Sequence, residues 1–223
     1  MVKILHLYHD LLNLYGEYGN IIVLCDALKK SNIDYKVDKL SIGDNFEFDD
    51  YDFIYCGSGT ESKTELALKD FIKRKDSFIK AFSNNKHILF TGSSILLLGN
   101  NGISLFNYNV DKTDNRICGD VIFESSDYKD IVGYINTSYK ISQNDLAYFK
   151  LLKSDITLKD YVGIGFKTNN LMTVNVTGPL LVKNPHLLKD LIIKLGGDSS
   201  LELNKHQYMS YEITLSELQK RFN

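Results

Sequence analysis

The sequence predicts an α/β fold with three layers, in which helices flank both faces of a mostly parallel central sheet. Two observations carry this prediction. Short apolar runs that suit buried parallel strands alternate with helical patterns through the first half of the chain. The composition is that of an ordinary globular protein, with 43% hydrophobic and 24% charged residues in a chain of 223. No linker, repeat or low-complexity segment interrupts the chain, so we expect a single domain over residues 1–223.

The first half contains three strand signals and two helical patterns. The predicted strands are the apolar runs at residues 2–8, 52–56 and 87–90. Asn20 is expected to cap the first helix, because its side chain suits a helix N-terminus. A longer helix is expected over residues 62–83, where six apolar side chains share one stripe. This β-α-β-α-β order predicts right-handed crossovers between parallel strands.

The second half is richer in strand signals. Strands are predicted at residues 118–123, 131–135, 161–166 and 171–176. Pro185 is expected to open a helix that ends at Gly196, because proline suits the first helical position and glycine follows helix ends. The segment from Ile213 to Phe222 predicts a final amphipathic helix.

The charge and the cysteines exclude several classes of function. The chain has 26 basic and 28 acidic residues, a net charge of −2, which would gather neither nucleic acid nor an anionic membrane. No run approaches the roughly 18 apolar residues of a membrane span. The three cysteines (Cys25, Cys56 and Cys118) show no metal-ligand spacing, so we expect no metal and no cofactor. An odd, sparse set of thiols predicts a cytoplasmic protein.

Three of the predicted strands end in small residues. Gly57-Ser58-Gly59 follows the second strand, Gly92-Ser93-Ser94 the third, and Thr177-Gly178-Pro179 the last. Ligands gather beyond the carboxyl ends of parallel strands, and glycine lets backbone N–H groups approach them closely. Gly57–Gly59 is therefore a candidate anion cradle. The glycines alone favour a tight strand-to-helix turn without a catalytic role.

Six segments, in this order along the chain, resemble those of a known family. They are Asp10–Asn20, Gly57–Glu61, Gly92–Gly99, Asn115–Asp120, Ile131–Asn136 and Thr177–Pro185. Together they resemble CobB/CobQ-type class I glutamine amidotransferase domains, above all the GatD subunits of lipid II isoglutaminyl synthase. The resemblance covers nearly the whole chain. It implies a class I glutamine amidotransferase-like, flavodoxin-like fold.

The resemblance also implies a reaction for which this chain lacks the reacting groups. Family members attack glutamine with a cysteine thiolate, and a histidine activates the thiol and protonates the ammonia. Gly92 stands at the cysteine position and Thr177 at the histidine position. Thr137, after Asn136, replaces a further histidine. The sequence therefore predicts a catalytically degenerate, partner-binding or ligand-sensing subunit.

The implied partner is a Mur-ligase-like ATP-dependent synthetase of the cell-wall type, or a cobyrinate-type synthetase of cobalamin biosynthesis. The implied ligand is glutamine or glutamate, whose carboxylate the family binds with the counterpart of Arg116. A guanidinium fork suits that role, although a surface salt bridge would explain Arg116 equally well. The candidate pocket residues are Gly57, Ser58, Gly59, Ser93, Arg116 and Asn136.

An alternative keeps the chain an enzyme. A displaced nucleophile, Cys56 beside the glycine turn or Ser93 on the next one, would then hydrolyse glutamine or another amide and supply ammonia. The surroundings of Ser93 lack the G-x-S-x-G pattern, and no histidine has a motif that would place it nearby. Measurable turnover that disappears in Cys56→Ala or Ser93→Ala would favour this alternative.

Overall fold

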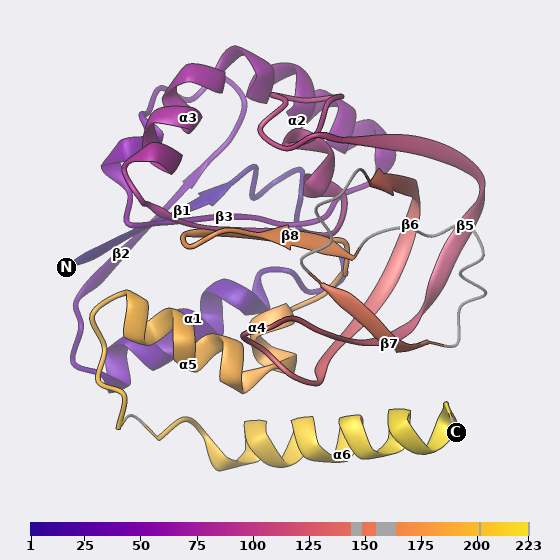
Figure 1. Cartoon of the computed structure of the whole chain (residues 1–223). Coiled ribbons are helices and arrows are strands. Elements are labelled where there is room, and N and C mark those ends of the chain that lie inside the picture. Colours follow the sequence, from indigo (N-terminus) through magenta and orange to yellow (C-terminus); the bar gives the residue numbers. More distant parts are fainter. Residues whose placement is uncertain (144–148, 155–163, 201, 223) are drawn as a thin grey trace.

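In a computed structural model of the chain, six strands form the central sheet (Figure 1). The structure describes residues 1–143, 149–154, 164–200 and 202–222. The strands of the central sheet are β1 (Val2–Leu7), β2 (Tyr35–Leu40), β3 (Phe53–Cys56), β4 (His87–Thr91), β8 (Gly165–Lys167) and β9 (Leu171–Val174). Their order is β2-β1-β3-β4-β9-β8. All neighbours are parallel except β8, which pairs antiparallel with β9. The predicted mostly parallel sheet is confirmed.

Helices cover both faces of this sheet, which gives the predicted three layers (Figure 1). One face carries α2 (Glu61–Lys73), α3 (Lys75–Ser83) and the short 3₁₀ helix η1 (Phe48–Asp50). The other face carries α1 (Gly19–Lys30), α4 (Leu180–Lys183) and α5 (Pro185–Lys194). Beyond this layer lies α6 (Lys205–Arg221), which runs along the edge of the molecule. A second 3₁₀ helix, η2 (Gly92–Leu97), directly follows β4.

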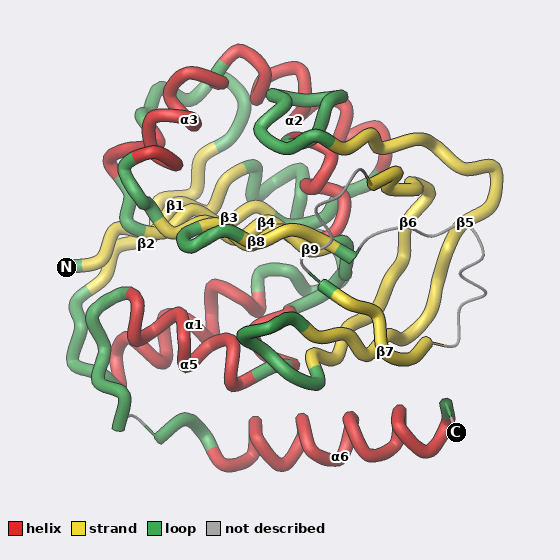
Figure 2. The backbone as a smooth tube through the Cα atoms, in the orientation of Figure 1, coloured by secondary structure: helices red, strands yellow, loops and turns green. Residues whose placement is uncertain are grey.

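A second sheet lies beside the first (Figure 2). It consists of β5 (Tyr108–Glu124), β6 (Ile131–Gln143) and β7 (Lys150–Ser154), paired antiparallel in the order β6-β5-β7. The strand signals at residues 118–123 and 131–135 therefore belong to this separate sheet. Both strands are longer than predicted, because their outer halves carry polar residues that gave no apolar signal.

Four details correct the sequence predictions. The helix expected over residues 62–83 is divided at Arg74, where the backbone leaves the helical region (φ −99°, ψ 9°). Asn20 is not the cap of the first helix, which begins at Gly19; its buried side chain instead bonds the hydroxyl of Tyr55. The edge strand β2 was not predicted, since most of its residues are solvent-accessible. The last helix begins at Lys205 rather than Ile213. Residues 161–163, which belong to a predicted strand, lie outside the described residues.

The core fills the space on both sides of the central sheet. Aromatic rings dominate one side, where Phe71 packs against Phe78 with ring centres 4.9 Å apart. Leucine and isoleucine side chains of α1 and α5, such as Leu24 and Leu188, dominate the other side. Burial of these apolar side chains stabilises each helix on the sheet. Within the described part of the chain, no helix has both the length and the apolar character that crossing a bilayer requires.

Candidate functional site

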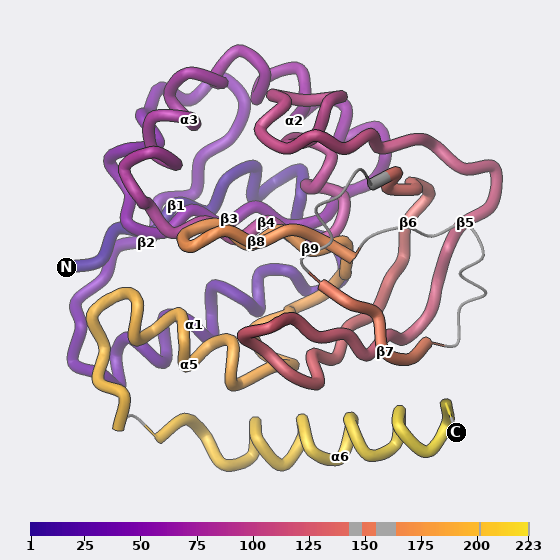
Figure 3. The backbone as a smooth tube through the Cα atoms, in the orientation of Figure 1, coloured from indigo at the N-terminus to yellow at the C-terminus, as the bar shows by residue number. Residues whose placement is uncertain are grey.

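The carboxyl ends of β1, β3, β4 and β9 meet at one edge of the central sheet, although they come from distant parts of the sequence (Figure 3). The chain runs from β1 to β2 in one direction along the sheet and reaches β3 on the other side of β1. In open α/β sheets, ligands bind at such a switch point, in a crevice beyond the carboxyl edge. The small-residue turns singled out in the sequence all lie at this edge.

Two loops pack tightly together there. We call residues 8–18, which follow β1, the opening loop, and residues 57–60, which follow β3, the glycine loop. The N–H of Leu14 donates to the carbonyl oxygen of Ser58 at 2.9 Å. A Cβ at Gly59 would lie 2.7 Å from the carbonyl oxygen of Leu11, closer than such atoms approach. Glycine is therefore required because the opening loop lies directly against this turn.

Gly92 and Thr177 lie side by side, as the resemblance implies for the cysteine and histidine positions. Gly92 has a φ of +58°, and a Cβ at this residue would lie 3.2 Å from Cγ2 of Thr177. The Thr177 N–H and hydroxyl both bond the carbonyl oxygen of Tyr134, at 2.7 Å and 3.1 Å. Gly92 has no side chain that could attack an amide, and the hydroxyl of Thr177 cannot act as a base near neutral pH.

A network of hydroxyl groups occupies the turn beside Gly92. Ser93 Oγ lies 2.8 Å from Thr64 Oγ1 and accepts a hydrogen bond from the N–H of Gly59 at 3.0 Å. Ser58 Oγ accepts from the N–H of Ser93 at 3.2 Å. The described hydrogen bonds of the Ser93 hydroxyl go to hydroxyl and backbone groups, without a histidine or a carboxylate. Without a base, a serine hydroxyl is a weak nucleophile.

Cys56 lies at the end of β3 in the hydrophobic core, with no exposed surface. Burial, followed by the nearby charge of Glu17, raises the pKa of its thiol well above the usual value. A thiol in this state is nearly all protonated at neutral pH and therefore unreactive. Cys118 is the exposed thiol, and its Sγ lies 3.3 Å from the side-chain oxygen of Asn136.

Glu17, on the opening loop, places a carboxylate in the interior beneath this edge. It accepts hydrogen bonds from the hydroxyls of Tyr55 and Thr91, the latter at 2.8 Å, and from the N–H of Gly178 at 3.1 Å. Its side chain has no exposed surface, and burial raises the pKa of Glu17 to about 7 although these hydrogen bonds act to lower it. The carboxylate joins the opening loop to β3, β4 and the residue after Thr177.

Arg116 lies on β5, next to the opening loop and the start of α2. Its Nε donates to the side-chain oxygen of Asn136 at 2.5 Å, and one terminal nitrogen lies 3.1 Å from a carboxylate oxygen of Glu61. The other terminal nitrogen donates to the hydroxyl of Tyr15 at 3.2 Å. Arg116 thus connects the second sheet to the opening loop and to the start of α2. Thr137 lies next to Asn136 on β6 and is buried, with its hydroxyl accepting from the N–H of Tyr139.

This chain is similar to characterised proteins over most of its length. It is 28% identical over 207 residues to the GatD subunit of the glutamine-hydrolyzing lipid II isoglutaminyl synthase from Staphylococcus aureus, which covers 86% of this chain and 84% of that protein. The corresponding subunit from Streptococcus pneumoniae is 25% identical over 205 residues, covering 86% and 79%. No family model matches the sequence.

Solved structures show the same fold at low sequence identity. PurLQS from Thermotoga maritima superposes with a TM-score of 0.54 at 17% identity, covering 96% of this chain and 100% of that one. A glutamine amidotransferase from Thermotoga maritima superposes with a TM-score of 0.53 at 15% identity, covering 99% and 97%. This chain is a class I glutamine amidotransferase-like domain similar to GatD. The fold class expected from the sequence is therefore confirmed.

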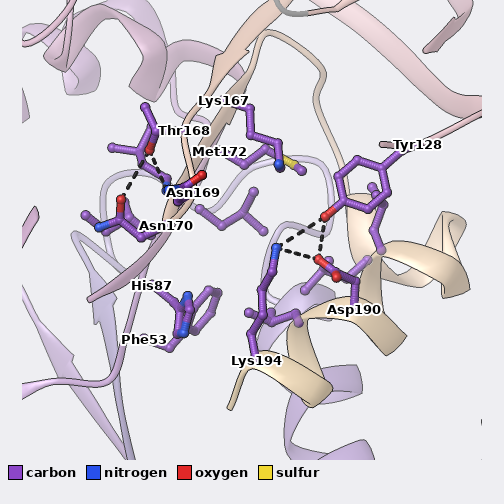
Figure 4. Close-up of a pocket in the computed structure, with 16 residues that line it drawn as sticks. Phe53, His87, Tyr128, Lys167, Thr168, Asn169, Asn170, Met172, Asp190 and Lys194 are labelled. Atoms are coloured by element: carbon purple, nitrogen blue, oxygen red, sulfur yellow. Dashed lines mark hydrogen bonds and ion pairs between the residues drawn. The ribbon is translucent and has the colours of Figure 1, made fainter. Parts of the chain in front are cut away.

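The amidotransferase-like chain has a further pocket at the opposite edge of the sheet, where β3 and β4 begin (Figure 4). It encloses about 50 Å³, and Phe53 and His87 line it from the first positions of those strands. Lys194 Nζ lies 2.7 Å from a carboxylate oxygen of Asp190, so these charges neutralise each other. The described residues contain no cluster of three or more histidine, cysteine or acidic side chains that could hold a metal ion.

Sequence reasoning missed two residues of the amidotransferase-like site, Glu17 and Glu61. Both lie inside segments that carry the resemblance, but an acidic residue in a loop or at a helix start gives the pattern of a solvated side chain. Glu17 is completely buried and Glu61 bonds both Arg116 and Ser138. The position of Glu17 between Gly16 and Gly19 was the one available signal.

Proposed function

We propose that this chain is the amidotransferase-like subunit of a synthetase complex and that it does not hydrolyse glutamine. One observation carries the proposal: the two positions that would hold the nucleophile and the base adjoin each other and are Gly92 and Thr177. Amide hydrolysis through a covalent intermediate needs a nucleophile that is activated by a base within hydrogen-bonding reach. Neither glycine nor threonine supplies such a base.

The environment of the other candidate nucleophiles supports the same proposal. Cys56 is fully buried and its thiol is held protonated. Ser93 has its hydroxyl among other hydroxyls and backbone groups, so none of its described partners can take up its proton. The displaced-nucleophile alternative would need one of these two side chains to leave its present surroundings.

The proposed partner is an ATP-dependent, Mur-ligase-like synthetase. Support comes from the two GatD relatives, each a subunit of lipid II isoglutaminyl synthase, which favours a cell-wall substrate. The CobB/CobQ type and a cobyrinate-type synthetase stay predictions from the sequence. In this proposal the chain stabilises or orients the synthetase, and the synthetase takes ammonia from solution rather than from glutamine.

A reconstituted complex tests this proposal. The synthetase and this chain would be copurified and supplied with ATP, the acceptor and either glutamine or ammonium chloride. We expect amidation with ammonium and none above background with glutamine, and no release of glutamate by the chain alone. Glutamine-dependent amidation that disappears in Cys56→Ala or Ser93→Ala would contradict the proposal and favour the displaced nucleophile.

A ligand-sensing role is a second candidate, and the position of Arg116 favours it. A guanidinium next to the opening loop and the start of α2 suits a carboxylate such as that of glutamine or glutamate. Asn136, Ser138 and Tyr15 surround the same guanidinium with polar groups that could bind the rest of an amino acid. In this role the bound amino acid would adjust the affinity for the synthetase.

A further inference from the structure

The backbone donors at the carboxyl edge are already bonded to side chains of this chain. The N–H of Ser93 donates to Ser58 Oγ at 3.2 Å, and the N–H of Gly59 donates to Ser93 Oγ at 3.0 Å. Both serine side chains are buried, with 2% of Ser58 and 8% of Ser93 exposed. Backbone N–H groups stabilise a developing oxyanion only when they are free to point at it. Here the hydroxyl oxygens of the two serines accept these hydrogen bonds in place of an oxyanion.

Ser58 also fills the space that a side chain at position 92 would need. A Cβ built on Gly92 lies 2.6 Å from both Cβ and Oγ of Ser58. Two carbon atoms do not approach that closely, and the Cβ of serine is fixed to its backbone. One of the two turns would therefore have to move to admit any side chain at position 92. The left-handed φ of +58° at Gly92 adds a further strain for residues other than glycine.

We infer that Ser58 closes the reaction site, and that a thiol at position 92 fits only when residue 58 has no Cβ. The inference rests on the proposed function and deepens it. Three features therefore occur together at adjoining residues. Gly92 has no thiol, Ser58 fills the space beside it, and Thr177 has no imidazole. Restoring cysteine and histidine alone would leave the cradle occupied by the hydroxyl of Ser58.

Three backgrounds for Gly92→Cys test this inference: the natural Ser58, Ser58→Gly and Ser58→Ala. The alanine variant is the matched control, because it removes the hydroxyl but keeps the Cβ that lies 2.6 Å from the new side chain. Each double variant is compared with its single parents in a cycle of melting temperatures, which isolates the interaction between the two positions. Reaction of position 92 with iodoacetamide, located by peptide mass spectrometry, reports access; sulfur bonds the reagent carbon as iodide leaves and the thiol proton goes to buffer.

With natural Ser58 or with Ser58→Ala, we expect Gly92→Cys to lower the melting temperature by at least about 5 °C, as overpacking does in a chain of this size. With Ser58→Gly the loss should shrink by at least half, and alkylation at position 92 should be at least about tenfold faster. The inference would be overturned if Gly92→Cys lowered the melting temperature equally in all three backgrounds. It would also be overturned if Ser58→Ala reduced this loss as much as Ser58→Gly does.

The Ser58→Gly variant alone provides a second measurement if the position 92 variants do not fold. The N–H of Ser93 then loses its buried acceptor, so its hydrogen exchange should be at least about tenfold faster than in the natural chain. An unchanged exchange rate would overturn the inference. These outcomes are separate from the proposed function, which fails only if the natural chain hydrolyses glutamine.

Discussion

The carboxylate of Glu17 accepts a hydrogen bond of 3.1 Å from the N–H of Gly178, a residue 161 positions later in the chain. This bond fixes the opening loop against the turn that contains Thr177. Because the same carboxylate also bonds Tyr55 and Thr91, one side chain connects the ends of β1, β3, β4 and β9. A single buried acid therefore connects the elements that carry the candidate site.

Glu17 should make the stability of the chain depend on pH. Its pKa is raised from 4.5 to about 7 in the folded protein, so the folded state binds the proton more tightly than the unfolded state. The stability that this group contributes is complete below about pH 4.5 and is lost as the pH rises through about 7. By linkage the loss amounts to about 3 kcal/mol. In Glu17→Gln, the free energy of unfolding measured by urea denaturation from pH 4 to 8 should lack this slope.

The matched control for Glu17 is Glu65→Gln, which changes an exposed carboxylate on α2. It should keep the pH dependence of the natural chain. If Glu17→Gln and the natural chain lost stability equally between pH 4.5 and 8, the buried carboxylate would not be the titrating group.

Arg116 should mediate any stabilisation by amino acids. Glutamate or glutamine at ten times its dissociation constant would raise the free energy of unfolding by about 1.4 kcal/mol, a shift in melting temperature of roughly 3–5 °C. Arg116→Ala should abolish the shift. Glu61→Gln should enlarge it, because the ligand carboxylate then no longer competes with the one that lies 3.1 Å from Arg116.

Lys220→Ala is the control for this experiment, since Lys220 is an exposed cation on α6, which lies apart from the crevice. It should respond to both amino acids like the natural chain. A natural chain whose melting temperature neither amino acid raises, even at tens of millimolar, would exclude ligand sensing and leave the partner-binding role.

Asn184 should be one of the most sensitive positions in the fold. Its side chain is completely buried and bonds both the N–H and the carbonyl oxygen of Val132 at 2.9 Å, as a neighbouring strand would. It thereby joins β6 of the second sheet to the layer formed by α4 and α5. Asn184→Ala leaves these buried groups without partners and should cost about 2–4 kcal/mol, measured by urea denaturation. Asn204→Ala, at the exposed cap of α6, should cost only about 1 kcal/mol; equal losses would contradict this role.

Much of the fold could be predicted because its signals are local. The apolar runs of β1, β3 and β4 and the Pro185 helix identified the layers, and parallel strands bring their carboxyl ends to one edge. That geometry explains why Gly92 and Thr177 could be expected together. The separate antiparallel sheet could not be predicted, because polar residues alternate through the outer halves of β5 and β6.

The closure of the site depends on contacts that no local pattern encodes. Ser58 and Gly92 are 34 residues apart, and their contact arises only because the turns after β3 and β4 adjoin. Glu17 is buried only because the opening loop folds back over the glycine loop. Sequence reasoning treats acidic and hydroxyl side chains in turns as solvated. It therefore identified Ser58 and Gly92 without their contact, and it missed Glu17.

The three cysteines should differ strongly in reactivity. Cys118 is exposed, Cys25 is half-buried and Cys56 has no exposed surface. In the native protein a thiol-specific disulfide reagent should modify Cys118 quickly. Burial also raises the pKa of Cys25, so that thiol should react more slowly. Cys56 should react only through unfolding of the core, at least about a thousandfold more slowly than Cys118.

This experiment bears directly on the displaced-nucleophile alternative. Cys118→Ser removes the fast phase and serves as the control, and mild denaturant should then expose Cys56 in parallel with loss of structure measured by circular dichroism. A nucleophile for glutamine has to be accessible and ionised in the folded protein. If native Cys56 reacted as fast as Cys118, the end of β3 would be accessible to small molecules. The proposal of a non-hydrolytic subunit would then be wrong, and the chain would be an active amidotransferase with Cys56 as its nucleophile.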